Sequence, residues 1–382
     1  MASTQHTPTE LEAAGDLVLP AADELAGSFP LTHNLHPATP EEYNEIMSTL
    51  AFGKKFTDHM AHMRWTREGG WNERGVIPYG PLELTPGASV FHYCQSVFEG
   101  IKAYKREDGS VWTFRPGYNA ARLNHSARRL ALPELSREDF VASLVDYVRA
   151  DVKWVPDVDG SSLYLRPFMF ASEEFVGVHP AGVVDYYVIG SPSGPYFKGG
   201  LSGVAIWVER EYHRAGPGGT GSAKAGGNYA ASLLPQIQAE AKGFSQVCFL
   251  DTYEGKYLEE LGGMNMFVVM ADGTIRTPGL TGVILEGGTR SAILRMLRDQ
   301  GVDVREEKIA LSEVVDGIRS GAVAEVFACG TAAVVTPITR LGGDDFDVEI
   351  AVGDKTREIH KRLTDIQWGR AEDPYGWTYR LA

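Results

Sequence analysis

The sequence contains very few cysteines. Only three occur among 382 residues, Cys94, Cys248 and Cys329, and they lie far apart. Disulfide frameworks and zinc sites need cysteines in larger numbers or at short, regular spacings, so we expect neither, and we predict no metal site. Unpaired thiols are typical of proteins in a reducing compartment, which favours a cytoplasmic location.

Long apolar runs and an excess of positive charge are also missing. No uninterrupted apolar stretch approaches the length of a membrane span. The N-terminal residues have neither the layout of a signal peptide nor the arginine-rich character of a transit peptide. The formal net charge is −14, whereas a protein that binds duplex nucleic acid needs a basic surface to neutralise phosphates. We therefore expect neither a membrane nor a nucleic acid among its partners.

The composition otherwise indicates a soluble globular protein that is long enough for two domains. Hydrophobic residues make up 43% of the chain and charged residues 23%. Residues 1–40 are rich in Ala, Thr, Pro and Glu with weak periodicity, which predicts a loosely ordered extension. Pro, Gly and Ser cluster between two strand-like runs, so we place an interdomain linker at 195–202. It separates a smaller domain, 41–194, from a larger one, 203–382.

Apolar periodicity predicts the main helices and strands. Helices are expected at 118–130, from a capping-box-like start at Ser136, at 290–300 and at 355–367. Strand-like runs cover 111–114, 163–170, 183–189, 204–208, 246–250, 266–270, 274–277 and 323–329. The Asp-Gly turn between the runs at 266–270 and 274–277 predicts a hairpin. Arg122 lies off the apolar stripe of its helix, so we expect its side chain to be free for an anion. Tyr164 and Arg166 share one face of their strand by the two-residue period.

The densest group of glycines surrounds a single lysine. Residues 216–229 read Gly-Pro-Gly-Gly-Thr-Gly-Ser-Ala-Lys-Ala-Gly-Gly-Asn-Tyr, and an apolar, alanine-rich segment follows. Glycines let backbone N–H groups approach a ligand closely, and a lysine between glycine and alanine is poorly solvated. Lys224 is therefore a candidate nucleophile.

Two other interpretations of this loop are open. A phosphate-binding P-loop is a poor match, because Ser222 and Ala223 separate the second glycine from Lys224. Ala225 also stands where that motif needs Ser or Thr for Mg²⁺. The second alternative is a flexible surface loop with an incidental lysine.

Further polar groups would complement Lys224. Tyr229 follows it by five residues, an acidic pair at 259–260 leads into Gly-Gly-Met-Asn, and candidate anion donors stand at 288–289, 331 and 122. A phosphorylated pyridine aldehyde would use all of them. The lysine would bind the aldehyde, a carboxylate would keep the ring nitrogen protonated, and the arginine and helix-terminal donors would take the phosphate.

Nine motifs together indicate a family. They are Phe52-Gly…Phe-Thr-Asp-His-Met60, Tyr93…Val-Phe-Glu-Gly100, Arg115-Pro…Arg122-Leu, Tyr164-Leu-Arg-Pro167, Gly194-Pro-Tyr-Phe197, Lys224-Ala-Gly-Gly-Asn-Tyr229, Glu260-Leu-Gly-Gly-Met-Asn265, Gly288-Thr-Arg290 and Gly330-Thr-Ala-Ala333. In this order the sequence resembles the branched-chain amino-acid aminotransferases, pyridoxal-phosphate enzymes of fold type IV. The resemblance implies an α/β (α+β) fold of two domains, each a mainly antiparallel or mixed sheet with flanking helices.

The resemblance also implies roles for individual residues. Lys224 would bind pyridoxal 5'-phosphate covalently, Tyr229 would contact the ring oxygen and Glu260 the ring nitrogen, although Glu259 beside it leaves the register open by one residue. The cofactor-binding set is completed by Arg122, Leu285, Gly288, Thr289 and Thr331. The substrate-binding set would be Phe52, Tyr93, Phe98, Tyr164, Arg166, Tyr196, Val176, Val178, Ala332 and Ala333.

The activity implied by the resemblance is reversible transamination of leucine, isoleucine or valine with 2-oxoglutarate, with ping-pong kinetics. Arg166 would hold the distal carboxylate of glutamate while aromatic walls hold an aliphatic group. Without the resemblance, Arg166 would be read as an ordinary ion-pair residue. For Arg122, an ion pair on a solvated helix face would be as good an interpretation as an anion site. A homodimer is also implied, with Val176 and Val178 closing the pocket of the partner.

The resemblance includes one departure and leaves two alternatives. Some family members carry a redox-active Cys-x-x-Cys after the Gly-Thr-Ala turn, but here those positions are Ala333 and Thr336, so thiol regulation is not expected. A D-amino-acid transaminase or aminodeoxychorismate lyase would share the cofactor residues but lack the Phe-Thr-Asp-His-Met motif. A nucleotide-binding protein using residues 216–224 would bind Mg²⁺–ATP and carry no chromophore.

Overall fold

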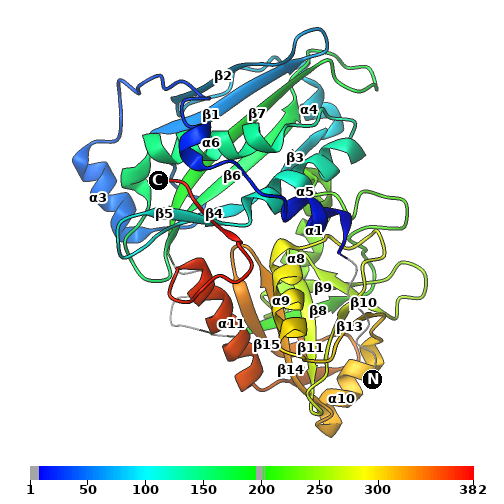
Figure 1. Cartoon of the computed structure of the whole chain (residues 1–382). Coiled ribbons are helices and arrows are strands. Elements are labelled where there is room, and N and C mark those ends of the chain that lie inside the picture. Colours follow the sequence, from blue (N-terminus) through cyan, green and yellow to red (C-terminus); the bar gives the residue numbers. More distant parts are fainter. Residues whose placement is uncertain (1–7, 195–200, 202) are drawn as a thin grey trace. The chain divides into compact units, whose positions relative to one another are not determined.

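The computed structural model describes residues 8–194, 201 and 203–382. Contacts between Cα atoms divide the chain into two compact units, Met1–Pro195 with Ile366–Ala382, and Tyr196–Asp365. Each unit has a sheet with helices packed on it (Figure 1), which confirms the predicted α/β class. The predicted linker, 195–202, lies outside the described residues except for Leu201.

The first unit is built on an antiparallel sheet. Its strand order is β17-β5-β4-β6-β7-β1-β2, and β3 also pairs with β6. The strands are β1 (His59–Thr66), β2 (Gly70–Pro78), β3 (Ser96–Phe98), β4 (Ile101–Lys105), β5 (Val111–Phe114), β6 (Ser162–Ala171), β7 (Val183–Ser193) and β17 (Thr378–Arg380). The helices are α1 (Glu10–Gly15), α2 (Ala22–Leu25), α3 (Pro40–Thr49), α4 (Ser89–Tyr93), α5 (Pro116–Arg129), α6 (Arg137–Ala150) and the short 3₁₀ helix η1 (Val152–Trp154).

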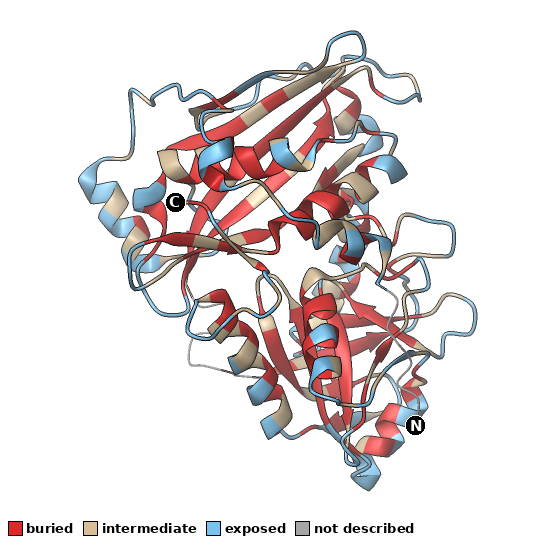
Figure 2. Ribbon diagram, in the orientation of Figure 1, coloured by how far each residue is buried: buried red, intermediate tan, exposed pale blue. Residues whose placement is uncertain are grey.

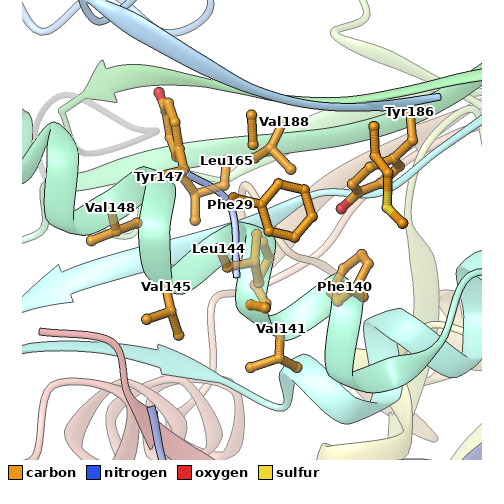
Figure 3. Close-up of a cluster of buried hydrophobic side chains, with 14 of the residues drawn as sticks. Phe29, Phe140, Val141, Leu144, Val145, Tyr147, Val148, Leu165, Tyr186 and Val188 are labelled. Carbon is orange, nitrogen blue, oxygen red and sulfur yellow. The ribbon is translucent and has the colours of Figure 1, made fainter. Parts of the chain in front are cut away.

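The core of the first unit lies between the sheet and α6. Phe140, Leu144 and Val148 on α6 pack with residues of β6 and β7, and Figure 3 shows these side chains with Phe29 in the same cluster. The helix begins where predicted, because the Ser136 side chain accepts a hydrogen bond from the backbone N–H of Asp139. Burying this apolar stripe fixes α6 on the sheet.

The expectation of a loosely ordered N-terminal extension does not hold for residues 8–40. A capping box of Thr9 and Glu12 starts α1, which packs on α5, and α2 packs on α6. The carboxylate of Asp146 accepts hydrogen bonds from the backbone N–H groups of Gly27 and Phe29 at 2.8 and 2.7 Å. The composition of this segment suggested disorder, because it has few apolar residues. The sequence alone could not show that α1 and α2 pack on α5 and α6.

The C-terminal segment also differs from the predicted domain division. The sequence places residues 366–382 in the larger domain, but they belong to the first unit. The reason is strand pairing, because β17 lies antiparallel to β5, and Leu381 is fully buried in the core of that unit.

The second unit is built on a mixed sheet. Its strand order is β10-β9-β8-β15-β14-β11-β12-β13, and β16 also pairs with β15. The strands are β8 (Val204–Glu209), β9 (Gln246–Leu250), β10 (Leu258–Leu261), β11 (Asn265–Met270), β12 (Ile275–Pro278), β13 (Val304–Glu307), β14 (Val323–Gly330), β15 (Val334–Gly342) and β16 (Asp347–Glu349). The helices are α7 (Gly226–Ala230), α8 (Leu233–Ala241), α9 (Gly288–Asp299), α10 (Leu311–Ser320) and α11 (Asp354–Gln367).

Parallel pairing in this sheet involves β8 with β9 and β15, and β12 with β13, whereas β11 and β14 pair antiparallel. The predicted hairpin of β11 and β12 is confirmed. Both faces of the sheet are covered, because Ile206 and Val208 of β8 pack in the cluster that includes Val314 of α10, whereas Trp207 of β8 packs with Ala239 of α8. Figure 2 shows these strands largely as buried, red segments. This rigid sheet supports the loops that carry the candidate site.

Candidate functional site

The glycine-rich loop holds Lys224 in a fixed position between β8 and α7. The Lys224 Nζ donates a hydrogen bond of 2.7 Å to the Tyr229 hydroxyl. The buried Asn228 side chain donates to the carbonyl oxygens of Thr220 and Ala223 at 2.7 and 2.9 Å, which ties the loop to the start of α7. A Cβ at Gly221 would overlap the carbonyl oxygen of Val283, so the close approach requires glycine there. The interpretation as an incidental lysine on a flexible loop is therefore not supported.

A buried carboxylate lies in the same unit. Glu260 stands on β10, and its Oε1 accepts a hydrogen bond of 2.6 Å from the backbone N–H of Leu285 and contacts the Arg214 guanidinium at 2.6 Å. Burial raises the pKa of Glu260 to about 7, against the lowering effects of Arg214, the Leu285 amide, Lys224 and Arg290. The carboxylate is therefore ionised above neutral pH and lies within electrostatic reach of Lys224.

The neighbouring Glu259 faces a different environment. It lines a separate cavity of about 130 Å³ together with Asp251 and Tyr257. Burial raises its pKa to about 7 as well, and Asp251 and Glu260 reinforce this shift while Arg214 opposes it. Of the two acidic residues, Glu260 is the one that contacts the loop at 285.

Arg214 is a site residue that the sequence analysis missed. Its guanidinium is buried and contacts Glu260, and the same Nη2 donates to the carbonyl oxygens of Gly221, at 2.8 Å, and Val283. Arg214 therefore connects three segments. Arg214 lies two residues before the glycine-rich loop, which suggested only weakly that it belongs to the site. The sequence alone could not show that Glu260 is its partner.

Two turns of the second unit present groups suited to an anion. The helix α9 begins at Gly288, with Thr289 in its first turn, and a helix N-terminus attracts negative charge. The Asn265 side chain donates a hydrogen bond of 3.0 Å to the Leu285 carbonyl oxygen, and a Cβ at Gly287 would overlap the Asn265 side chain. This packing fixes the loop that leads into α9.

The second turn, residues 331–333, joins β14 to β15. Thr331, Ala332 and Ala333 line a cavity of about 430 Å³ together with Tyr229 and Met264. This places three residues of the predicted set beside the tyrosine that contacts Lys224. Cys329, just before the turn, is buried, and burial raises the pKa of its thiol to about 12, so the thiol is protonated at neutral pH.

The first unit gathers an aromatic group around Arg166. The Phe52 and Tyr164 rings meet edge to face with centroids 4.8 Å apart, and the Arg166 guanidinium lies 4.7 Å from the Phe98 ring centroid. Arg166 Nη2 donates to the Tyr164 hydroxyl at 3.2 Å, so these two side chains share a face as the strand period predicts. The arrangement combines an apolar wall with one cation.

Arg122 is placed differently from the expectation. It is 4% exposed rather than free on the helix surface, and its Nε and Nη2 donate to the two carboxylate oxygens of Glu99 at 2.8 and 2.7 Å. Glu99 is fully buried and also accepts from the Asn119 side chain at 2.7 Å. The expectation that the Arg122 side chain is free was wrong, because at this position of α5 it faces the buried acid Glu99. Glu99 was visible in the Val-Phe-Glu-Gly motif but had no predicted role.

The remaining predicted substrate residues of the first unit are exposed. The Tyr93 hydroxyl donates to the Val176 carbonyl oxygen, and the Val178 side chain is 87% exposed. Phe91 and Phe175 are exposed in the same region, where Ala88, the residue before α4, forms an antiparallel bridge with Glu174. Tyr196 lies outside the described residues.

The described residues form no metal site and no membrane-spanning helix. Among residues 8–194, 201 and 203–382, no group of three or more His, Cys, Asp or Glu side chains is placed to hold a metal ion. In the same part of the chain, every helix is too short or too polar to cross a bilayer.

Comparison with known proteins finds extended similarity. The sequence matches the family model described as amino-transferase class IV over residues 96–341. A branched-chain-amino-acid aminotransferase from Mycolicibacterium smegmatis is 48% identical over 360 residues, which cover 92% of this chain and 98% of that protein.

Two solved structures are similar in both fold and sequence. The branched-chain amino acid aminotransferase of Escherichia coli has a TM-score of 0.70 and 28% identity, covering 84% of this chain and 100% of the other. The branched-chain aminotransferase of the thermophilic archaeon Thermoproteus uzoniensis, solved with norvaline, has a TM-score of 0.69 and 27% identity, covering 84% and 100%.

Proposed function

Because the chain belongs to the class IV aminotransferases, we propose that it catalyses the reversible transamination of leucine, isoleucine and valine with 2-oxoglutarate. The products are the branched-chain 2-oxo acids and L-glutamate. The observation that carries the proposal is the 2.7 Å contact between Lys224 and Tyr229 in a unit that also holds the buried Glu260. The names of the relatives support the substrate class.

The residues of the second unit fit pyridoxal 5'-phosphate. The group needs a lysine for covalent attachment, a carboxylate for the ring nitrogen, a donor for the ring oxygen and an anion site for the phosphate. Lys224, Glu260 and Tyr229 meet the first three needs. Leu285, Gly288, Thr289 and Thr331 lie at or beside the two turns suited to the phosphate. Arg122 is proposed as a further phosphate ligand from its motif and from its orientation by Glu99 within the first unit.

When bound, pyridoxal phosphate supplies an aldehyde for covalent attachment and a ring that withdraws electrons from the substrate Cα. The chain does the rest. Lys224 Nζ would act as the general base that takes the Cα proton of the substrate and, in its protonated form, as the general acid that gives that proton back. The Tyr229 hydroxyl keeps Nζ in position, and the carboxylate of Glu260 stabilises positive charge on the ring nitrogen. The same residues serve both half-reactions, so the kinetics are ping-pong.

The aromatic group of the first unit is proposed to bind the substrate side chain. Phe52, Phe98 and Tyr164 provide apolar surface for an aliphatic group, and Arg166 provides a cation for the distal carboxylate of glutamate. Tyr93 is proposed to extend this surface, and Ala332 and Ala333 to offer backbone N–H groups to the α-carboxylate. Tyr196, which lies outside the described residues, is proposed as a substrate-binding residue from its motif alone. The aromatic surface with Arg166 can therefore accept the side chains of both substrates in turn.

A homodimer and a cytoplasmic location are also proposed. Exposed apolar residues at Phe91, Val176 and Val178 form a surface that a second copy of this chain could cover, and they include the two valines expected to close the pocket of the partner. The three cysteines are free, as is usual in a reducing compartment.

The proposal is tested by absorbance spectroscopy of the purified protein. We expect a bound chromophore whose spectrum changes when L-leucine is added and is restored by 2-oxoglutarate. A spectrum that responds to D-amino acids but not to L-leucine would favour the other class IV activities. A protein that binds no pyridoxal phosphate would refute the proposal.

A further inference from the structure

Arg214 lies where three functional segments of the second unit meet. Its Nη2 contacts the Glu260 carboxylate at 2.6 Å, the carbonyl oxygen of Gly221 at 2.8 Å and that of Val283. Gly221 belongs to the loop that carries Lys224, and Val283 precedes the loop that leads into α9. One guanidinium therefore links the lysine loop, the buried carboxylate and the approach to the anion-binding helix.

The charges around Glu260 make this arginine necessary. Glu260 is 3% exposed, and the adjacent Glu259 adds a second acidic group. Burial favours the protonated carboxyl, which could not carry the negative charge that a protonated ring nitrogen needs. Among the groups that face Glu260, the effect of Arg214 is the largest of those that favour the ionised form, ahead of the Leu285 amide, Lys224 and Arg290.

We propose that Arg214 is the positioning residue that keeps Glu260 ionised and aimed at the ring nitrogen of the cofactor, while it fastens the lysine loop to the 283–287 segment. This inference rests on the proposed function, because it assumes that Glu260 meets a pyridine ring. Arg214 does not touch the reacting atoms. It acts through Glu260, and its effect is therefore specific to the ring nitrogen.

A purely structural arginine would behave differently. If Arg214 only held the loops together, its loss would weaken the binding of any ligand of the same shape. If it sets the charge of Glu260, its loss weakens binding only where the ring has a nitrogen. An analogue of pyridoxal phosphate with a carbon in place of the ring nitrogen separates the two roles.

The experiment measures dissociation constants for pyridoxal phosphate and for the carbon analogue, by fluorescence titration of the full chain after cofactor removal. We expect R214M to bind pyridoxal phosphate about 20-fold more weakly, the scale of one charged hydrogen bond, and the analogue less than about 3-fold more weakly. R214K keeps the charge, so its preference for pyridoxal phosphate over the analogue should stay within about 3-fold of that of the unmodified protein.

A matched control is R276M. Arg276 on β12 is also largely buried in this unit and pairs with Glu307 and Glu313 at 2.6 and 2.5 Å, but it is not part of the site. R276M should leave both dissociation constants within about 2-fold. Equal losses for both ligands in R214M, or equal loss of preference in R214K and R214M, would overturn the inference and leave the proposed function standing. Failure of the unmodified protein to bind pyridoxal phosphate would instead refute the proposed function.

Discussion

Each unit contains a buried ion pair, but the residue proposed to be functional is the cation in the first unit and the acid in the second. In the first unit the acid Glu99 holds the proposed functional cation, Arg122, through two hydrogen bonds. In the second unit the cation Arg214 holds the proposed functional acid, Glu260. Removing two charges from water costs several kcal/mol, so such pairs contribute little net stability. We propose that each pair supports a charge needed for binding.

The pairs also differ in how they are embedded. Glu99 and Arg122 join α5 to the β3–β4 connection, and Glu99 also accepts hydrogen bonds from the Asn119 side chain and, at 3.3 Å, from the backbone N–H of Gly100. Glu260 and Arg214 also bind backbone groups of three loop residues, Leu285, Gly221 and Val283. The first pair is therefore mainly a side-chain interaction, whereas the second also organises loops. Apolar replacement should distinguish them.

The largest effect is expected from breaking the first pair. E99L leaves Arg122 buried without its acid and should lower the free energy of unfolding by about 3–5 kcal/mol in denaturant titration. The double variant E99L/R122M should recover most of that loss, because two apolar side chains can replace a buried pair. The matched control is E134L, which breaks the exposed Arg128–Glu134 pair and should cost less than about 1 kcal/mol.

The same double replacement in the second unit should not recover. E260L/R214M leaves the Leu285 N–H and the carbonyl oxygens of Gly221 and Val283 without their partners, so the protein should stay destabilised. If both double variants recover equally, or if E99L costs no more than E134L, the contrast between the two pairs is wrong.

The next effect concerns the pH dependence of stability without cofactor. The folded pKa of Glu260 is raised by burial to about 7 from 4.5. A raised carboxyl pKa gives stability that is complete below pH 4.5 and is lost as the pH rises through 7. Between pH 5 and pH 8 this group should therefore lower the free energy of unfolding by about 2–3 kcal/mol. E260Q should flatten that part of the pH profile by the same amount.

E259Q is the control for this prediction. Burial also raises the pKa of Glu259 to about 7, so E259Q should flatten the profile in the same direction. Turnover should separate the two, since E260Q should lose about two decades in rate and E259Q much less. The assignment of Glu260 fails if E259Q is the more damaging change.

The smallest effect concerns substrate choice in the first unit. R166A removes the cation beside Tyr164 and Phe98, and a glutamate carboxylate without it would be unpaired among aromatic rings. The half-reaction with glutamate should therefore be impaired by about 1.5–3 kcal/mol, and that with leucine much less. Single-turnover absorbance of each half-reaction measures this, and equal losses would make Arg166 a structural residue.

Much of the fold could be predicted because local signals agree with it. The helix predicted at 118–130 begins at Pro116 in the structure, and Ser136 is the N-cap of α6, as predicted. The Asp-Gly turn joins β11 to β12 in the predicted hairpin. The contact between Lys224 and Tyr229 joins residues five apart on one short segment. These features could be predicted because the residues that form them are close together in the sequence.

The missed features all depend on long-range contacts. The helices α1 and α2 are held in place by packing on α5 and α6. The strand β17 pairs with β5, which lies far earlier in the chain, as the partners Thr378 and Phe114 show. Glu99 with Arg122, and Arg214 with Glu260, are single side-chain pairs without any periodic pattern. Charge and position along the chain suggest that such residues have partners, but only the fold determines which.

The central claim is that Lys224 attaches the cofactor, and peptide mapping tests it most directly. Borohydride reduction of the protein with bound pyridoxal phosphate, followed by proteolysis and mass spectrometry, should place the label on the peptide that contains Lys224. K224A should give no fixed label. A label on another lysine in the unmodified protein, or a fixed label that persists in K224A, would contradict the account.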